Sequence, residues 1–448
     1  MKPTAVIAIF DVGKTNKKFF LFNEQYQIVL ERSAQFAETK DEDGFPCDDL
    51  QKLREWVKSG IEEVINLKQF SVKAFNFSAY GASFVHIDAK GEPVTLLYNY
   101  LKPYPPDLQE KFYKAYGGET GFSVLTASPV LGNLNSGLQL YWLKHNKQTF
   151  YTRIQFSLHL PQYISFLVTG KKYSEITSIG CHTGLWDFTK NNYHQWVDAE
   201  GIRNLLPLVF SSDEVSEVKI KGNSIKVGPG LHDSSSALIP YLAGFIEPFI
   251  LISTGTWCIS MNPFNNEPLT TKELKQDCLS YLTYRGKPVK ASRLFAGNEH
   301  EQQVKRMAVH FGVPVDEYKK VVFVPSYFKK IKRTAEAGTA FSQKELSGFS
   351  TYAEAYHQLM YDIMLQQKMA TSLVLGKSKV TRIFVDGGFA QNPVYMYMLA
   401  NAFPGKEVFA ASVSQASAIG AALAIHKHWN TEPVPGNMVE LKYYAVTK

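Results

Sequence analysis

The first residues that could carry chemistry lie in the stretch "AIFDVGKTNKKFFLF", residues 8–22. It contains the letters GKT, but a phosphate-binding P-loop reads GxxxxGK[ST] between a strand and a helix. Here an alanine takes the place of the first glycine, and the residues after Asn16 are aromatic and β-branched, as in a strand. The pattern therefore predicts a β-hairpin whose tip carries Asp11, Gly13 and Thr15.

Such a tip can bind phosphate without a P-loop. Its backbone N–H groups and the Thr15 hydroxyl can donate hydrogen bonds to phosphate oxygens, and the carboxylate of Asp11 can hold Mg²⁺ through water. Lys18 can add a positive charge beside a transferring phosphoryl group. The alternative interpretation is an ordinary tight turn with a solvent-facing lysine.

A second hairpin with the same character is predicted by "PFILISTGTWCISMNP", residues 248–263. An apolar strand leads to a tip with Gly255 and Thr256, and another strand follows. Two hairpins with polar, glycine-containing tips, about half a chain apart, predict two similar lobes that each begin with a hairpin. Two unrelated β-turns are the alternative.

The stretch "GLHDSSSA" places His232 and Asp233 just before a predicted helix. An aspartate at that place can be a simple N-cap. It can also be a general base that accepts the proton of a substrate hydroxyl as the hydroxyl attacks a phosphoryl group, with His232 holding the substrate. The two roles are compatible, because an N-cap position faces a cleft.

Two segments near the C-terminus could lie against a nucleotide base. In "DGGFAQN", the pair Gly387 and Gly388 with Asn392 after it predicts a turn that brings a helix start close to a planar base. In "ASAIGAALA", a stripe of small residues that includes Gly420 would let a backbone or a flat ligand approach closely. The segment "GNEHEQQ" does not predict a metal site around His300, since consecutive residues do not share a helix face.

The elements that must position these residues alternate between strand-like and helix-like segments, which predicts an α/β protein. Residues 50–66, for example, place Leu53, Val57 and Ile61 on one face of a predicted helix. At 448 residues the chain is long enough for two or three domains. We place the boundary between the halves at residues 243 and 244, just before the second hairpin.

Composition and charge are those of an ordinary globular protein, with 45% apolar and 20% charged residues. The net charge of +7 is scattered along the chain, and its densest run, residues 327–333, is interpreted as a solvated surface rather than a nucleic-acid site. No apolar run reaches the ~18 residues that a membrane span needs. The four separate cysteines are typical of reduced thiols, so we expect a cytoplasmic protein. They are Cys47, Cys181, Cys258 and Cys278.

The order of these motifs resembles that of the FGGY carbohydrate kinase family, and most closely its rhamnulokinase and L-fuculokinase branch. The ordered set is DxGxTxxK, YG, GxHD, GTW, DGG with a following Asn, and a small-residue helix. The resemblance covers nearly the whole chain. It implies a two-lobed, actin-like (ribonuclease H-like) ATPase fold that closes around ATP and a sugar, with residues 1–243 forming the N-terminal lobe and 244–448 the C-terminal lobe. A homodimer is compatible with it.

The resemblance also implies a role for each motif. Asp11 would be associated with Mg²⁺, and Asp233 would be the catalytic base. The phosphates would lie on both tips, at Gly13, Thr15, Asn16, Lys18, Gly255 and Thr256. The adenosine would lie at Gly387, Gly388, Asn392 and Gly420. The sugar would contact Gly81, Asn135, Gln139 and His232.

Five residues depart from the family's pattern. Lys14 replaces a small or hydroxyl residue in the first tip, and Gln415 stands where an acidic residue often precedes the small-residue helix. Tyr80 and Ser83 lie in "AYGASF" where the branch has "TWGVDF", and Gln162 replaces a usual aspartate. The nucleotide half therefore fits the pattern better than the sugar half.

The leading hypothesis is an ATP- and Mg²⁺-dependent kinase for a ketose such as L-rhamnulose or L-fuculose. A non-catalytic sugar or nucleotide sensor with the same lobes is a second hypothesis, and the retention of both Asp11 and Asp233 argues against it. An actin-like ATPase without a sugar substrate is the third. Such an ATPase would be expected to carry a partner-binding appendage, and none is visible in the sequence.

Overall fold

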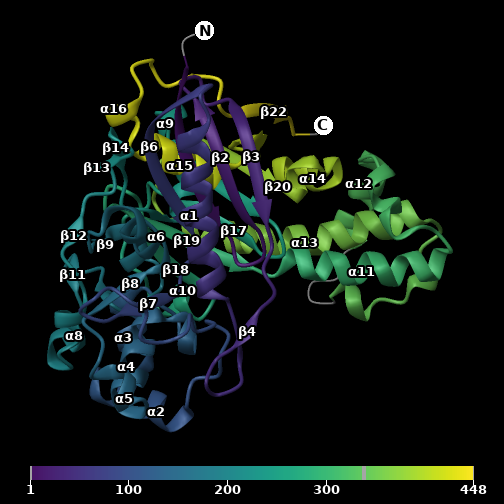
Figure 1. Ribbon diagram of the computed structural model, residues 1–448. Helices are drawn as coiled ribbons and strands as arrows, with labels where there is room; N and C mark the ends of the chain where they lie inside the picture. Colours follow the sequence, from purple (N-terminus) through teal and green to yellow (C-terminus); the bar gives the residue numbers. More distant parts are fainter. Residues whose placement is uncertain (1–2, 335–339, 447–448) are drawn as a thin grey trace.

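The computed structural model describes residues 3–334 and 340–446, which fold around two mixed β-sheets of seven strands each (Figure 1). The first sheet has the order β13-β14-β6-β1-β2-β3, and β15 also pairs with β6. The second has the order β18-β19-β17-β16-β20-β21-β22. Helices flank both sheets, so the α/β prediction is confirmed. We call the part built on the first sheet the first lobe and the part built on the second sheet the second lobe.

The first sheet contains β1 (Thr4–Val12), β2 (Lys17–Asn23), β3 (Ile28–Ala34), β6 (Phe70–Ala79), β13 (Ser216–Ile220), β14 (Asn223–Val227) and β15 (Leu231–His232). The second contains β16 (Phe249–Thr254), β17 (Cys258–Asn262), β18 (Cys278–Leu282), β19 (Pro288–Leu294), β20 (Arg382–Gly387), β21 (Glu407–Ser412) and β22 (Glu440–Tyr444).

The two lobes repeat one arrangement. β1 pairs antiparallel with β2 and parallel with β6, and β16 pairs antiparallel with β17 and parallel with β20. In both lobes the parallel strand is reached through a helical crossover, which parallel pairing requires. The prediction of two similar lobes, each beginning with a hairpin, is therefore confirmed over the interpretation of two unrelated turns.

Different sets of helices cover the two lobes. α1 (Leu50–Asn66) buries Leu53, Val57 and Val64 against the first sheet, as its spacing predicts. The small helices α2 (Pro106–Ala115), α3 (Gly118–Thr126), α4 (Ser136–Asn146) and α5 (Gln148–Tyr151) gather at the end of the molecule opposite the N-terminus (Figure 1). On the second lobe, α11 (Ala296–Phe311), α12 (Pro325–Thr334) and α13 (Tyr352–Leu375) lie together at one side. The lysines of α12 are exposed, in agreement with a solvated face.

Two helices join the lobes. α9 (Asp233–Gly244) packs closely along α15 (Ala416–Ala424), and a Cβ atom on Gly420 would overlap the carbonyl oxygen of Ser236. Across the same contact, Asn76 Nδ2 of β6 donates to the Ala421 carbonyl at 2.7 Å. The small-residue stripe thus serves the approach of a helix backbone, one of the two alternatives that the sequence left open. Gly420 itself is buried in this helix contact rather than exposed to a nucleotide cavity.

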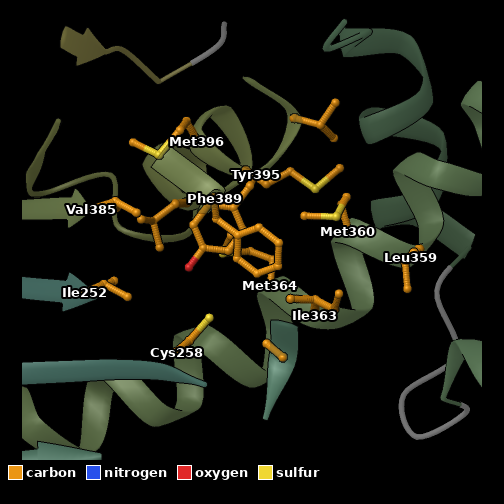
Figure 2. Close-up of a cluster of buried hydrophobic side chains, with 14 of the residues drawn as sticks. Ile252, Cys258, Leu359, Met360, Ile363, Met364, Val385, Phe389, Tyr395 and Met396 are labelled. Atoms are coloured by element: carbon orange, nitrogen blue, oxygen red, sulfur yellow. The ribbon is translucent and has the colours of Figure 1, made fainter. Parts of the chain in front are cut away.

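The buried core of the second lobe includes Phe389, which directly follows the double glycine. Figure 2 shows Phe389 among the buried side chains of Cys258, Met364 and Tyr395. The rings of Phe389 and Tyr395 stack with centroids 4.8 Å apart. Because protein cores are close-packed, this stacking fixes the turn that carries Gly387 and Gly388. Among the described residues, no helix is long and apolar enough to cross a membrane.

Candidate active site

The first tip connects β1 to β2 and is closed by a hydrogen bond from the Gly13 N–H to the Asn16 carbonyl, at 2.9 Å. A Cβ on Gly13 would lie 2.9 Å from that same oxygen, so the turn has no room for a side chain there. Thr15 and Asn16 are exposed, and Asn16 Oδ1 accepts from Gln35 Nε2 at 2.7 Å. The exposed hydroxyl of Thr15 and the exposed tip can therefore meet a ligand, as the sequence predicts.

Asp11 at the end of β1 meets the second lobe directly. Its Oδ2 accepts a hydrogen bond from Ser417 Oγ of α15 at 2.8 Å. Burial raises the pKa of the Asp11 carboxyl to about 6; the Ser417 hydrogen bond opposes this rise, and the negative charge of Asp233 adds to it. Two carboxylates thus lie close enough to repel each other, an arrangement that a cation would stabilise.

A cavity of about 250 Å³, here called the interlobe cavity, opens beside these carboxylates. It is lined from the first lobe by Asp233 and from the second by Ser253, Asp386 and Ser417, together with Ser234, Ala237, Leu251, Ile259 and Met261. Asp386 is a functional candidate that sequence reasoning did not single out, although its DGG motif was noted. Its Oδ2 accepts from Tyr241 Oη at 2.8 Å, and burial raises its pKa.

Asp233 is the first residue of α9, and the N-cap is His232. The Oδ1 atom of Asp233 accepts from the Ser234 N–H at 2.6 Å and lies 3.2 Å from His232 Nε2. Its side chain is 35% exposed and faces the interlobe cavity. The N-cap alternative does not describe this geometry, because capping would require a bond to a backbone N–H two or three residues further into the helix.

His232 is held from several sides. Its backbone N–H donates to Thr177 Oγ1 at 2.9 Å, and its ring atom Nε2 lies 3.1 Å from Cys181 Sγ. Burial lowers the pKa of His232, and the neighbouring Asp233 opposes that effect. The imidazole is therefore neutral near pH 7 and fixed in orientation beside the carboxylate.

The second tip connects β16 to β17, with Gly255 and Thr256 exposed. The α11 helix begins directly beneath it: Asn298 N–H donates to the Thr256 carbonyl at 3.2 Å, and a Cβ on Gly297 would overlap the Gly255 carbonyl oxygen. A helix N-terminus carries partial positive charge, so this position favours an anion such as phosphate.

A cavity of about 480 Å³, here called the second-lobe cavity, adjoins this tip. It brings together three predicted nucleotide residues, Gly255, Gly388 and Asn392. Gly387 is not a lining residue but directly precedes Gly388, with a φ of 88° and a Cβ position that Thr254 would block. The remaining lining residues are Thr254, Gly297, His300, Tyr318, Lys319, Phe389, Gln391 and Pro393.

Asn392 is engaged in a hydrogen-bond network at the floor of this cavity. As the N-cap of α14 (Pro393–Ala402), its Oδ1 accepts from the Tyr395 N–H at 3.2 Å, and its Nδ2 donates to Tyr356 Oη at 2.7 Å. His300 Nε2 lies 2.9 Å from the same Tyr356 oxygen. Burial lowers the pKa of His300 to about 4. His300 is thus an uncharged, aromatic part of the cavity wall, to which Lys319 adds a positive charge.

The four predicted sugar residues lie in one connected region of the first lobe. A Cβ on Gly81 would lie 2.9 Å from His232 Cδ2, so the imidazole packs directly on this glycine. Gln139 Nε2 donates to the Ala82 carbonyl, and Asn135 Nδ2 donates to the His182 carbonyl, both at 2.8 Å. Asn135 and Gln139 therefore shape the backbone around Gly81 and Cys181, while Gly81 and His232 lie nearest to Asp233.

The five residues that depart from the family pattern are buried or form hydrogen bonds in the structure. Gln162 Nε2 donates to the Gly230 carbonyl at 2.8 Å and so supports the loop before His232. Ser83 is buried. Gln415 accepts from Lys18, and Lys14 and Tyr80 both contact Asp48.

Within the part of the chain that the structure describes, no group of three or more His, Cys, Asp or Glu side chains could hold a metal ion. Asp11 offers a carboxylate oxygen, with Asp233 nearby. Magnesium is commonly held by one or two carboxylates plus substrate phosphates and water. These residues fit a Mg²⁺ ion that arrives with a nucleotide, and they do not form an all-protein cage.

Family models match both halves of the chain. The N-terminal domain of the FGGY family of carbohydrate kinases matches residues 6–239, and the C-terminal domain of carbohydrate kinase FGGY matches residues 246–433. The chain belongs to the FGGY family of carbohydrate kinases. Family membership, expected from the order of the motifs, is confirmed. Residues 243 and 244 fall between the two matched ranges, and the boundary itself stays a prediction.

The curated relatives of this FGGY chain include rhamnulokinases. One from Halalkalibacterium halodurans is 24% identical over 269 residues, 55% of this chain and 52% of the relative. Another, from Bacteroides thetaiotaomicron, is 23% identical over 239 residues, 50% of this chain and 47% of the relative. The matched part spans about half the length of these curated relatives.

Solved structures resemble the FGGY chain over nearly its whole length. A carbohydrate kinase from Novosphingobium aromaticivorans has a TM-score of 0.81 at 22% identity, covering 99% of this chain and 95% of that one. A ligand-bound xylulose kinase from Lactobacillus acidophilus has a TM-score of 0.79 at 16% identity, covering 99% and 94%. The two-lobed, actin-like sugar-kinase fold is therefore confirmed.

Proposed function

We propose that this chain transfers the γ-phosphoryl group of ATP to a hydroxyl of a ketose of the L-rhamnulose or L-fuculose type. The observation that carries the proposal is the interlobe cavity, where Asp233 of the first lobe faces Ser253 and Asp386 of the second, beside Asp11. A cavity with a partly exposed carboxylate, in a chain with two exposed tips that could bind phosphate, suits phosphoryl transfer to an alcohol.

Asp233 is the proposed base. Its carboxylate is partly exposed to the cavity, and His232 fixes its orientation from 3.2 Å. A sugar hydroxyl that enters beside Gly81 and His232 gives its proton to Asp233 as its oxygen attacks phosphorus. Such proton transfer contributes about 10²- to 10⁴-fold to a rate.

The two tips are the proposed phosphate sites. Gly13, Thr15, Asn16 and Lys18 serve the transferring phosphoryl group from the first lobe, and Gly255 and Thr256 serve the remaining phosphates from the second. A bound Mg²⁺ ion, held by Asp11 and by phosphate oxygens, would neutralise charge that develops on the phosphates. The nucleoside would occupy the second-lobe cavity beside Gly387, Gly388 and Asn392. Gly420 is not part of this proposal, because its position serves the helix contact.

The sugar is the least constrained part of the proposal. Rhamnulokinases among the curated relatives support a ketose of that type. Tyr80, Ser83 and Gln162, by contrast, differ from the branch pattern within or behind the surface formed by Gly81 and His232, here called the sugar wall. We propose that Gly81 and His232 contact the sugar and that Asn135 and Gln139 hold their surroundings in place.

A coupled ADP-release screen across ketoses, polyols and aldoses, with a reaction lacking sugar, tests the proposal. We expect turnover with one or a few ketoses and little ADP release without sugar. Equal ADP release with and without every sugar would instead support an actin-like ATPase. Sugar or nucleotide binding by calorimetry without any turnover would support a sensor.

A further inference from the structure

A buried carboxylate lies between the first tip and the sugar wall. Asp48 Oδ2 accepts from Lys14 Nζ and from Tyr80 Oη, each at 2.6 Å, and Asp48 Oδ1 lies 3.3 Å from Lys17 Nζ. Asp48 follows the short strand β5 (Pro46–Cys47) and is only 8% exposed. One carboxylate therefore joins three segments that are distant in sequence.

Two of its partners are departures from the family's pattern. Lys14 belongs to the first tip, and Tyr80 directly precedes Gly81 of the sugar wall. The Lys14 ammonium also lies 3.2 Å from Glu38 and 5.9 Å from the centre of the Tyr80 ring. Lys14 is thus held on the sugar side of the tip, where Asp48 and Glu38 balance its charge.

Asp48 and Tyr80 keep their usual charge states in this cluster near pH 7. Burial acts to raise the pKa of Asp48, but hydrogen bonds from Lys14 and Tyr80 and the charges of Lys14 and Lys17 outweigh it and lower that pKa. Burial and the Asp48 charge raise the pKa of Tyr80. The cluster therefore persists as carboxylate, ammonium and neutral phenol. Charge-assisted hydrogen bonds of this kind are shorter and stronger than neutral ones.

The backbone already brings the two segments side by side, since the Tyr80 N–H donates to the Val12 carbonyl at 3.1 Å. This bond ends where β1 ends, and beyond it the first tip is exposed. The Lys14–Asp48–Tyr80 cluster continues the connection past that point. Lys17 supports the same link, because its Nζ donates to the Lys14 carbonyl at 2.8 Å and lies 3.3 Å from Asp48 Oδ1.

We propose that Asp48 is a positioning residue that holds the first phosphate tip in register with the sugar wall, through Lys14 on one side and Tyr80 on the other. The inference rests on the proposed function, because register matters where a donor phosphate must meet an acceptor hydroxyl. A misplacement of about 1 Å can lower a rate about 10²-fold.

The test uses Lys14→Met, Tyr80→Phe and the double variant of the full chain, with the best sugar from the screen. We expect each single variant to lower kcat about ten-fold or more with sugar, while the KM for ATP changes less than about three-fold. Because both act through Asp48, the double variant should lose little more than the worse single variant. Lys14→Arg, which keeps the positive charge, should retain a higher kcat than Lys14→Met. Lys40→Met is the matched control, since Lys40 is exposed nearby and has no ion pair among the described residues.

A second readout needs no activity. Hydrogen exchange of the unliganded protein should become faster at residues 13–17 and at residues 80–83 in Lys14→Met, and not in Lys40→Met. Unchanged exchange at both segments, or losses in kcat that simply multiply in the double variant, would overturn the proposal. If the wild-type chain phosphorylates no sugar, the proposed function fails, and the exchange result still decides whether Asp48 links the two segments.

Discussion

The ammonium of Lys18 in the first lobe lies 3.2 Å from Oε1 of Gln415, 397 positions further along the chain. Gln415 precedes α15 in a left-handed backbone conformation, with a φ of 54°, and aims its amide at the first hairpin. A neutral amide orients Lys18 without neutralising it. Glu31 Oε1 lies 3.9 Å from the same ammonium. The neutral residue at Gln415 thus adds no second negative charge to Lys18 beside the proposed site of the transferring phosphoryl group.

Gln415→Glu should therefore weaken catalysis by giving Lys18 a second carboxylate partner besides Glu31 and by adding negative charge near Asp11. A charge pair at about 4 Å is worth roughly 1 kcal/mol in a solvated setting, so we expect kcat/KM for ATP to fall about five-fold. Steady-state kinetics at low and high salt measure this effect, which should shrink as salt screens it. Gln415→Met, which adds no charge, should change it less. Equal losses in both variants would contradict the charge argument.

Gly388 lies at the mouth of the second-lobe cavity, where an added Cβ would meet no atom within 4 Å. Gly388→Leu should therefore fold normally and fill the cavity. We expect the KM for ATP to rise at least about ten-fold, a loss of about 1.4 kcal/mol, with an unchanged thermal midpoint. Gly348→Leu is the control, because Gly348 is also unobstructed and lies outside this cavity. Unaltered ATP affinity in Gly388→Leu would place the adenosine elsewhere.

Gly420 separates two explanations of the small-residue stripe. If it serves the α9–α15 contact, Gly420→Ala forces a methyl group into the Ser236 carbonyl. This substitution should lower the free energy of unfolding by about 1–3 kcal/mol. Thermal and urea unfolding measure this change, and Gly405→Ala, at an unobstructed surface glycine, should have little effect. A stable Gly420→Ala protein with weakened ATP binding would instead restore the adenosine role that the resemblance implies.

The sequence predicts the parts of this protein whose signals are local. The two hairpins, the crossover helix at residues 50–66 and the turn before Asp233 follow from periodicity and from turn residues, and each is present. The place of Asp11 at the end of a strand and next to the first tip also follows from the sequence.

Other features depend on segments that meet only in the folded chain. His300 and Tyr318 reach the second-lobe cavity from α11 and the short helix after it, and nothing in their local pattern points to a nucleotide. Lys14 and Tyr80 read as separate departures, yet one carboxylate, Asp48, binds both. A helix contact and a flat ligand both select small residues, so the sequence alone could not assign Gly420.

Asp233 is the proposed base of a sugar phosphorylation at the interlobe cavity. Asp233→Asn keeps the size and a hydrogen-bond acceptor of the side chain but cannot take the proton. Nucleotide contacts come from other segments, so ATP affinity should survive, and the thermal midpoint should change little because His232 is the N-cap.

The most direct test is turnover of Asp233→Asn with the best sugar from the screen, measured beside ATP affinity and the thermal midpoint. We expect turnover to fall about 10²- to 10⁴-fold while ATP still binds and the protein remains folded. Near wild-type turnover in a folded Asp233→Asn protein would contradict the proposed role of Asp233.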